Sequence, residues 1–441
     1  MNVSFLQVIV SLLAGIIFII LLTVKFKVHP FFALIVACFI TGLGVQLPFA
    51  EISSLIKNGF GDVMSKLAII IVLGTTIGVL LEKNRSTNVM AASILKLVSQ
   101  KRSSLALSIT GFIVGLPIFC DSGYIVLSGI NRSLIKRTGM AVATMSISLA
   151  SGLYAVHCLL PPHPGATAAA ATLEVDFGKV ILYGILIAIP AMLIGHWWAV
   201  YAGKKTKNDN VPAETDEEIS TGPKPILAFL PVVIPILLMA LKSVLVLDKN
   251  KTGFLIDVFA IVGDPAIALA IGVLLAILTG KNSKHSLSFQ LSSAVEKAGG
   301  ILVIIGAGGA FGAVLAATNI GGHFEKNLDL KMLGIWFPFL LTCLIKTAQG
   351  SSTVAIITAS SIVLPLLPVL GLGSENAKLL TVLAMGAGSM MISHSNDAYF
   401  WVISKFSDID VRNMLRVHSI ASVLMGLITM IVVYILSLII L

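Results

Sequence analysis

The stretch HCLLPPHPGATAAAATL, from His157 to Leu173, lies between two apolar segments that are each long enough to cross a membrane. Proline removes a backbone donor and clashes with the preceding helical turn, and glycine relaxes the backbone that follows. The three prolines and Gly165 therefore predict a helix that is broken within its apolar segment. The second half-helix would begin near the middle of the membrane, where its unpaired N–H groups and the positive end of its dipole favour an anion.

The composition is that of a membrane protein with many spans. Of the 441 residues, 57% are hydrophobic and only 12% are charged, and the mean hydropathy is +1.00, which is far too apolar for one soluble core. The net charge of +9 comes from basic residues in the loops between apolar segments, so topology explains it and we expect no nucleic-acid partner. The four cysteines lack the spacing of metal ligands. We expect an all-α polytopic membrane protein without a metal or another cofactor.

Apolar windows of about 20 residues mark the predicted membrane crossings. They lie at 3–24, 29–47, 63–82, 139–173, 178–203, 225–247, 257–280, 297–320, 379–404 and 414–441. An N-terminus on the outside places most of the lysines and arginines in the inside loops, as the positive-inside rule requires. Two further segments, 103–130 and 332–370, do not fit a simple crossing.

The segment 103–130 has basic residues on both sides, at Arg102 and Arg132, so both of its ends are expected in the cytoplasm. It is too short to cross the membrane twice, because each leg would rise only about 20 Å. We therefore predict a re-entrant hairpin whose tip, PIFCDSG, faces protein or a water-filled cavity. The segment 332–370 is either a second such hairpin, around KTAQGSST, or two short full spans.

The second half of the chain repeats the plan of the first. EISSLIKNGFGDV at Glu51 is similar to QLSSAVEKAGGIL at Gln290, and each precedes a glycine-rich apolar span. A second broken helix, at SHSNDAYF, matches the first. Each half then contains five crossings, one of them a broken helix, plus one re-entrant hairpin, and an odd number of crossings inverts the second half relative to the first. We expect two inverted-topology repeats, residues 1–203 and 225–441, joined by a polar cytoplasmic linker, 204–224.

Four motifs resemble the signature segments of the gluconate permease (gluconate:proton symporter) family: IFCDSGYIVL, VHCLLPPHPGATAAA, KTAQGSSTVAIITAS and SHSNDAYFWV. The resemblance extends over nearly the whole chain. It implies a carrier of gluconate, a related sugar acid, glycerate or D-serine, with the fold of the wider ion-transporter superfamily. That fold would be a homodimer in the bacterial inner membrane with a scaffold domain and a moving transport domain. Three residues depart from the commoner family pattern: Cys120 stands where a larger apolar or aromatic residue is usual, Lys346 where arginine is usual and Tyr399 where a small residue is usual.

The hairpin tips and the broken helices are expected to meet around one central cavity, as in other transporters built from inverted repeats. Asp121, an acid inside the membrane, is expected to carry a coupled proton unless it forms a structural ion pair with Lys346. His163 is a second candidate proton carrier, and His157 is either a third or a packing histidine. The polar residues of these segments are the candidate substrate ligands: Ser122, Gly123, His163, Gly165, Thr167, Lys346, Gln349, Gly350, Ser351, Ser352, Thr353, Ser395, Asn396 and Asp397.

Together these features predict a secondary active transporter that imports a small hydroxylated monocarboxylate, such as gluconate or glycerate, with protons. Helix N-termini and Lys346 would meet the carboxylate, and serine, threonine, glutamine and asparagine side chains would meet the hydroxyl groups. Sodium coupling and D-serine transport are the nearest alternatives, and an anion channel is a more distant one. An enzyme is not expected, since the chain has no H-E-x-x-H motif and no nucleophile elbow.

Overall fold

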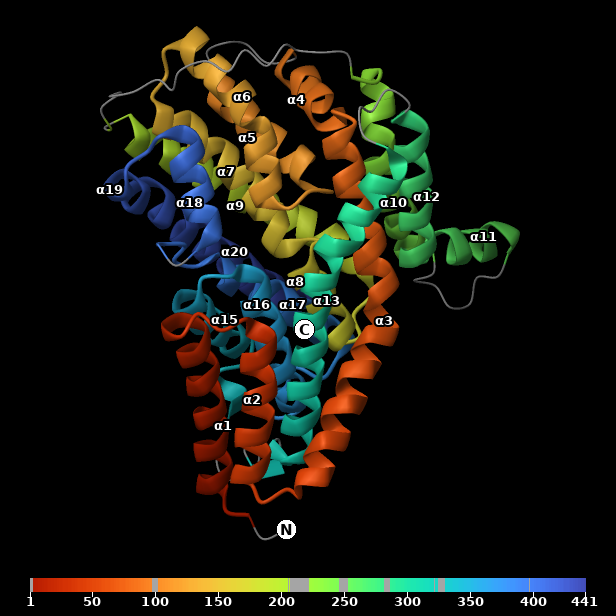
Figure 1. Ribbon diagram of the computed structural model, residues 1–441, viewed down its shortest axis with the longest axis vertical. Coiled ribbons are helices and arrows are strands. Elements are labelled where there is room, and N and C mark those ends of the chain that lie inside the picture. The colour runs from red at the N-terminus through yellow and green to blue at the C-terminus, as the bar shows by residue number, and fades with distance from the viewer. Residues whose placement is uncertain are drawn as a thin grey trace.

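The computed structural model describes residues 3–96, 102–204, 206, 222–245, 253–280, 286–320, 322–323, 330–395 and 397–441. Within these residues all regular structure is helical (Figure 1). The α-helices are α1 (Phe5–Ile20), α2 (Pro30–Gly44), α3 (Phe49–Lys83), α4 (Ser86–Lys96), α5 (Ser103–Gly115), α6 (Cys120–Thr138), α7 (Val142–Leu159), α8 (Pro164–Thr172), α9 (Phe177–Gly203), α10 (Pro225–Leu245), α11 (Phe254–Val262), α12 (Pro265–Thr279), α13 (Leu287–Ala317), α15 (Trp336–Gln349), α16 (Ser352–Val363), α17 (Glu375–Met390), α18 (Ala398–Ser407), α19 (Val411–Met414) and α20 (Ile420–Ile440). Short π-helical turns lie at Leu21–Lys25 and Leu415–Ser419, and 3₁₀ turns at Leu330–Met332 and Leu364–Leu366.

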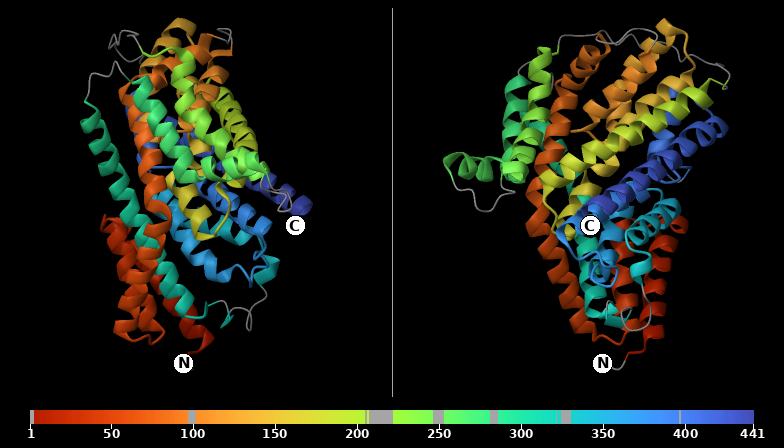
Figure 2. Two further views of the ribbon diagram at one scale, coloured as in Figure 1. Left: turned by 90° about the vertical axis from the view of Figure 1, so that its right-hand side faces the viewer. Right: turned by 180° about the vertical axis from the view of Figure 1, so that it is seen from behind.

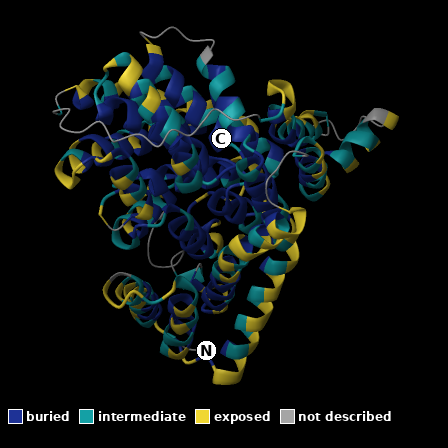
Figure 3. Cartoon of the chain, turned by 45° about the horizontal axis from the view of Figure 1, so that its top comes forward, coloured by how far each residue is buried: buried dark blue, intermediate teal, exposed yellow. Residues whose placement is uncertain are grey.

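The helices form a membrane protein, as predicted. In the described part of the chain seven helices are long and apolar enough to cross a membrane, or eight if the bent pair of α11 and α12 counts as one span. Large apolar side chains are exposed on the outer helices, for example Ile69, Leu274 and Ile439, which suits contact with lipid. Every residue of α7 is buried, and Figure 3 shows the buried residues gathered in the interior.

Two long helices, α3 and α13, run antiparallel along the molecule (Figures 1 and 2). They cross at Gly59 and Gly309, where a Cβ on either residue would lie 2.6 Å from the carbonyl oxygen of the other. Only glycine permits so close an approach of two helix backbones. Further along, Nζ of Lys297 on α13 lies 3.5 Å from Oε2 of Glu82 on α3. Elements from both halves of the chain pack on this pair, α12 against α3 and α2 against α13.

Both predicted helix breaks are present. The first separates α7 from α8, and His163 is the N-cap of α8, with Pro164 at the first helical position, where the missing N–H of proline costs nothing. The second separates α17 from α18, and Oδ1 of Asp397 caps α18 by accepting from the N–H of Tyr399 at 3.0 Å. Each break therefore starts a new helix at a defined residue inside the apolar part of the chain.

Two helix pairs occupy the predicted hairpin positions. Residues 116–119 join α5 to α6, and Gly350 and Ser351 join α15 to α16. The helices α5, α15 and α16 contain 13, 14 and 12 residues, fewer than the about 20 that a bilayer requires. The fourth helix, α6, contains 19 residues, so helix length alone does not distinguish hairpins from full spans, and re-entrant hairpins in both segments stay a prediction.

Two predicted crossings begin earlier than expected. The crossing at 63–82 belongs to α3, which starts at Phe49, and the crossing at 297–320 belongs to α13, which starts at Leu287. Hydropathy windows exclude the polar first turns of both helices, although nothing in those turns breaks a helix. The predicted linker 204–224 lies almost entirely outside the described residues.

The predicted crossing at 257–280 is bent near Gly263. The helices α11 and α12 meet there at an angle of 70°. Gly263 follows the end of α11, and the side chain of Asp264 caps α12, whose first residue is Pro265. An aspartate N-cap followed by proline is a strong local signal for a new helix, and it overrides the continuous hydropathy of the segment.

Candidate functional site

In the first half of the chain, the broken helix meets the turn between α5 and α6. Nε2 of His163 donates to the carbonyl oxygen of Gly115, at the end of α5, over 2.9 Å. The imidazole rings of His157 and His163 are 5.0 Å apart, and the ring of Phe119 lies 6.4 Å and 6.3 Å from them. The structure therefore brings the two predicted histidines together beside the turn.

In the second half, Lys346 and Asp397 form a buried ion pair. Nζ of Lys346 lies 2.7 Å from Oδ2 of Asp397, and the lysine side chain is 0% exposed. The same Nζ donates to the carbonyl oxygen of Gly350, a residue with φ of 87°, in the left-handed region that favours glycine. Nε2 of His394 donates to the carbonyl oxygen of Thr347 over 3.1 Å. The second broken helix is thus fastened to the second helix pair.

The two halves meet where α8 packs against α16. A Cβ on Gly165 would lie 3.3 Å from Cα of Thr353 and 2.9 Å from Cδ1 of Ile356, so the first turns of the two helices touch. Because α8 begins at Pro164 and α16 at Ser352, the positive ends of two helix dipoles lie side by side. Adjacent helix N-termini in a buried place favour a negatively charged ligand.

Three buried polar atoms of the predicted site residues have no hydrogen-bond partner within the described structure. They are Nδ1 of His157, Oγ1 of Thr167 and Nε2 of Gln349. Thr167 lies in the first half of α8, and Gln349 is the last residue of α15, directly before the turn that leads into α16. Since buried polar groups are nearly always hydrogen-bonded, these atoms mark places for a polar ligand or for water.

Asp121 lies in the first turn of α6, and its charge interacts with those of Asp397 and Lys346. Sγ of Cys120 lies 3.9 Å from its Oδ1. The alternative interpretation of Asp121, a structural ion pair with Lys346, is not what the structure shows, because Lys346 is paired with Asp397. Asp121 is half-buried and close enough to the buried Lys346–Asp397 pair for their charges to interact, and together the three groups carry one net negative charge when all are ionised.

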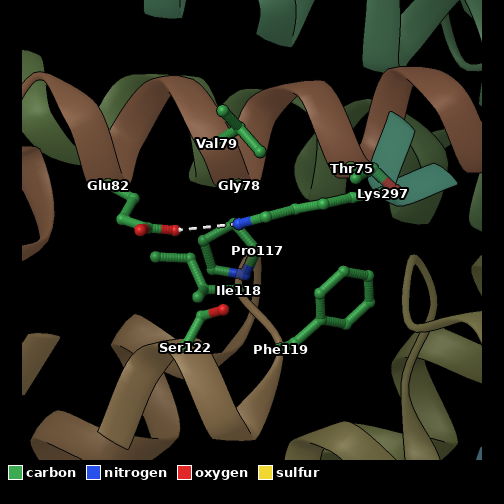
Figure 4. Close-up of a pocket in the computed structure, with 9 residues that line it drawn as sticks. All are labelled: Thr75, Gly78, Val79, Glu82, Pro117, Ile118, Phe119, Ser122 and Lys297. Atoms are coloured by element: carbon green, nitrogen blue, oxygen red, sulfur yellow. Dashed lines mark ion pairs between the residues drawn. The ribbon is translucent and has the colours of Figure 1, made fainter. Parts of the chain in front are cut away.

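Ser122 and Gly123, two predicted ligands next to the turn between α5 and α6, lie against neighbouring helices. Ser122 lines a small pocket between the turn and α3, across which Lys297 pairs with Glu82 (Figure 4). Gly123 faces α7, where a Cβ would lie 2.7 Å from Cδ2 of Leu153. In this conformation Gly123 serves helix packing.

Other predicted ligands have structural roles in this conformation. Oγ of Ser351 caps α16 by accepting from the N–H of Val354 at 3.3 Å. The carbonyl oxygen of Ser395 accepts from the indole N–H of Trp401 at 2.8 Å. Asn396 lies outside the described residues.

Comparison with known proteins identifies the family. Residues 7–439 match the family described as GntP family permease. The chain belongs to this family. The permease is 32% identical to the gluconate permease of Pseudomonas aeruginosa over 446 residues, which cover 97% of each chain. It is 31% identical to the Gnt-II system L-idonate transporter of Escherichia coli K12, with 94% of this chain and 95% of that protein covered.

One further relative and two solved structures are also similar to the permease. The D-serine transporter of Escherichia coli O6:H1 is 30% identical to the permease, with 98% of this chain and 99% of that protein covered. The YdaH transporter of Alcanivorax borkumensis has a TM-score of 0.58, with 88% of each chain covered, and MtrF of Neisseria gonorrhoeae has a TM-score of 0.62, with 88% and 84% covered. Both structures are 15% identical to the permease and show the fold alone. The predicted family is confirmed, and these relatives are permeases and transporters, not enzymes.

Two residues at the permease's site are absent from the predicted set. Oγ of Ser393 donates to Oδ2 of Asp397 over 2.5 Å, and Nε2 of His418 lies 3.1 Å from the same Oγ. Tyr399, one of the three departures from the family pattern, donates its hydroxyl to the carbonyl oxygen of Ala150 over 3.1 Å and connects the second break to α7. The sequence did carry a signal for His418, because an ionisable residue inside an apolar crossing is rare without a function.

Proposed function

We propose that this permease is a secondary active transporter that imports a small hydroxylated monocarboxylate, such as gluconate, a related sugar acid or glycerate, by proton symport. Its relatives named for gluconate and L-idonate support this substrate class. In the proposed arrangement it is a homodimer of the bacterial cytoplasmic membrane. Residues 1–203 and 225–441 form inverted-topology repeats joined by the linker 204–224. The pairs α5–α6 and α15–α16 are re-entrant hairpins, and alternating access exposes the site to each face in turn.

One observation carries the substrate class: the N-termini of α8 and α16 touch at Gly165 and Thr353, close to candidate ligands whose polar atoms lack partners. A carboxylate fits two helix N-termini, because both offer free N–H groups and positive dipole ends. Thr167 and Gln349, with their unpartnered oxygen and nitrogen, suit the hydroxyl groups of a sugar acid. A neutral sugar has no negative charge for the two helix dipoles to stabilise. A dicarboxylate would bring a second negative charge, and Lys346 is the one lysine that we place at the site.

The charges of the site support proton coupling. With Asp121, Asp397 and Lys346 ionised and the histidines neutral, the site has one net negative charge before substrate arrives. A second negative charge about 4 Å from the first costs about 4 kcal/mol at an effective dielectric constant of about 20. A proton that arrives with the substrate removes this cost. Asp121 is the carrier that the sequence indicates, His157 and His163 are its predicted alternatives, and Asp397 is a further acid of the same site.

The test is uptake by the purified permease in sealed proteoliposomes. We expect accumulation of gluconate or glycerate that follows an imposed pH gradient, and no accumulation of citrate, succinate or glucose. Uptake that follows a sodium gradient and does not respond to pH would show that the permease is coupled to sodium and not to protons. Accumulation of D-serine in preference to every hydroxy acid would replace the substrate class, and non-saturating anion flux would indicate a channel.

A matched pair of threonine variants tests the site itself. Thr167→Val removes the hydroxyl without changing the shape of the side chain. It should raise the KM for gluconate about tenfold or more, because a hydrogen bond to a charged or strongly polar ligand contributes about 1.5–3 kcal/mol. Thr144→Val is the control, since Thr144 is equally buried with an unpartnered Oγ1 but lies against Gly203 of α9. Equal KM values in both variants would remove Thr167 from the substrate site.

A further inference from the structure

A continuous hydrogen-bonded chain connects His418 to the buried ion pair. Nε2 of His418 lies 3.1 Å from Oγ of Ser393, and that Oγ lies 2.5 Å from Oδ2 of Asp397, the oxygen bound to Nζ of Lys346. An ionised carboxylate only accepts hydrogen bonds. The hydroxyl of Ser393 must therefore donate to Asp397, so it accepts from the Nε2–H of His418.

Two further hydrogen bonds connect Ser393, the middle residue of this hydrogen-bonded chain, to the start of α20 and the turn before it. The N–H of Ser393 donates to Oγ of Ser422 over 3.0 Å, and Oγ of Ser419 donates to the carbonyl oxygen of Ser393. His418 and Ser419 belong to the π-helical turn Leu415–Ser419 that precedes α20. Such π-helical turns occur frequently at functional sites, because they turn one side chain out of the regular helical register. Here the turn directs His418 toward the second break.

The surroundings of His418 contain few other groups that can exchange a proton. Its ring lies 6.4 Å from that of Tyr154 on α7, and 5.9 Å and 6.2 Å from those of Tyr399 and Phe400 on α18. The charges that act on it are those of Asp397 and Lys346. On its own turn Arg416 is exposed, and the carbonyl oxygen of that arginine accepts from Trp198 on α9.

We propose that Asp397, rather than Asp121, holds the coupled proton, that His418 and Ser393 deliver it, and that protonation of Asp397 releases Lys346 to bind the carboxylate of the substrate. His418 takes a proton at Nδ1 and gives its Nε2 proton to Oγ of Ser393. Ser393 passes its own hydroxyl proton to Oδ2 of Asp397. Each transfer moves one proton, so His418 and Ser393 end neutral and Asp397 becomes a carboxylic acid.

This step links proton and anion binding, and it rests on the proposed proton symport of a carboxylate. In the present conformation Lys346 is neutralised by Asp397 and is fully buried, so it has no charge left to offer a substrate. A proton on Asp397 leaves one positive charge beside the N-terminus of α16. The substrate's carboxylate then returns the site to the net charge that it has without either ligand, so neither ligand binds well without the other.

Three variants in proteoliposomes test the delivery path. His418→Gln and Ser393→Ala should lower both pH-driven accumulation of gluconate and the accompanying proton influx about tenfold, while gluconate counterflow at equal pH falls no more than about twofold. A purely structural histidine would lower both activities together. His196→Gln is the matched control, because Nδ1 of His196 lies 3.0 Å from Oγ of Ser148 in a similar histidine–serine pair, and it should leave both activities unchanged.

Binding by the purified protein provides a second measurement that does not depend on the fold of the histidine variant. With one linked proton, the Kd of the wild type for gluconate should rise up to tenfold per pH unit above the titration range, and Asp397→Asn should remove this dependence. Two results would overturn the delivery path and leave the proposed proton symport intact. They are a His418→Gln protein that accumulates gluconate like the wild type, and an Asp397→Asn protein whose gluconate binding keeps the pH dependence of the wild type. A wild type that ignores the pH gradient overturns the proposed proton symport and this proposal with it.

Discussion

Replacing Lys346 with methionine should destabilise the permease by about 3–5 kcal/mol, because it leaves Asp397 buried without its partner. Nζ and Oδ2 are 2.7 Å apart, and the two side chains are 0% and 9% exposed, so water cannot compensate the remaining charge. The hydrogen bond from Nζ to the carbonyl oxygen of Gly350 is lost as well. Methionine keeps an unbranched, flexible side chain at the position, so the change removes the charge with little effect on packing.

Thermal unfolding of the detergent-solubilised protein, followed by its size-exclusion peak, measures this loss. An unfolding entropy of about 2.1 cal/mol/K per residue converts it into a fall in Tm of about 3–5 °C for a chain of this length. The double variant Lys346→Met/Asp397→Asn removes both charges and should recover most of the stability. A single variant as stable as the wild type, or a double variant no more stable than the single one, would refute the reasoning.

Three further predictions concern topology, the meeting of the two halves and the outer ion pair. Cysteines at Arg102 and Arg132 should both be labelled from the cytoplasmic side only, and labelling from opposite sides would show that the segment between them crosses the membrane. Gly165→Val should abolish gluconate uptake by separating two helices, whereas Gly61→Val, where a Cβ meets nothing within 4 Å, should leave uptake unchanged. Lys297→Met breaks an ion pair that is 40% exposed at the lysine, so it should shift Tm by no more than about 1 °C.

The helix breaks could be predicted because their causes are local. Prolines before Gly165 and the polar run before Tyr399 interrupt a helix whatever surrounds them. The same local logic applies to Asp264 and Pro265, where continuous hydropathy concealed an N-cap and a first-turn proline. The early starts of α3 and α13 could not be found in the same way, because a hydropathy window ends at charged residues that a long helix tolerates.

The composition of the site was predicted better than its pairing. The segments that carry Lys346 and Asp397 were both expected at the site, but the ion pair joins residues 51 positions apart, and no periodicity predicts such a contact. Asp121 was the more obvious partner for the lysine because each lies near the tip of a predicted hairpin. The fold decides otherwise, since Asp397 caps α18 at the break and its second oxygen is left to face the lysine.

The two halves of the chain contribute different chemistry to the site, and this asymmetry matters for the proposed transport. The first half supplies neighbouring histidines and the N-terminus of α8, while the second supplies a neutralised lysine and the N-terminus of α16. A carboxylate held between the two N-termini would contact both halves at once, at the place where Gly165 and Thr353 already touch. In the proposed mechanism the lysine can offer its charge only after Asp397 is protonated. The bound substrate would therefore be neutralised between the two halves of the chain. With Asp121 ionised, the loaded site would carry the same net charge as the empty one, so loading adds no further charge that must cross the membrane.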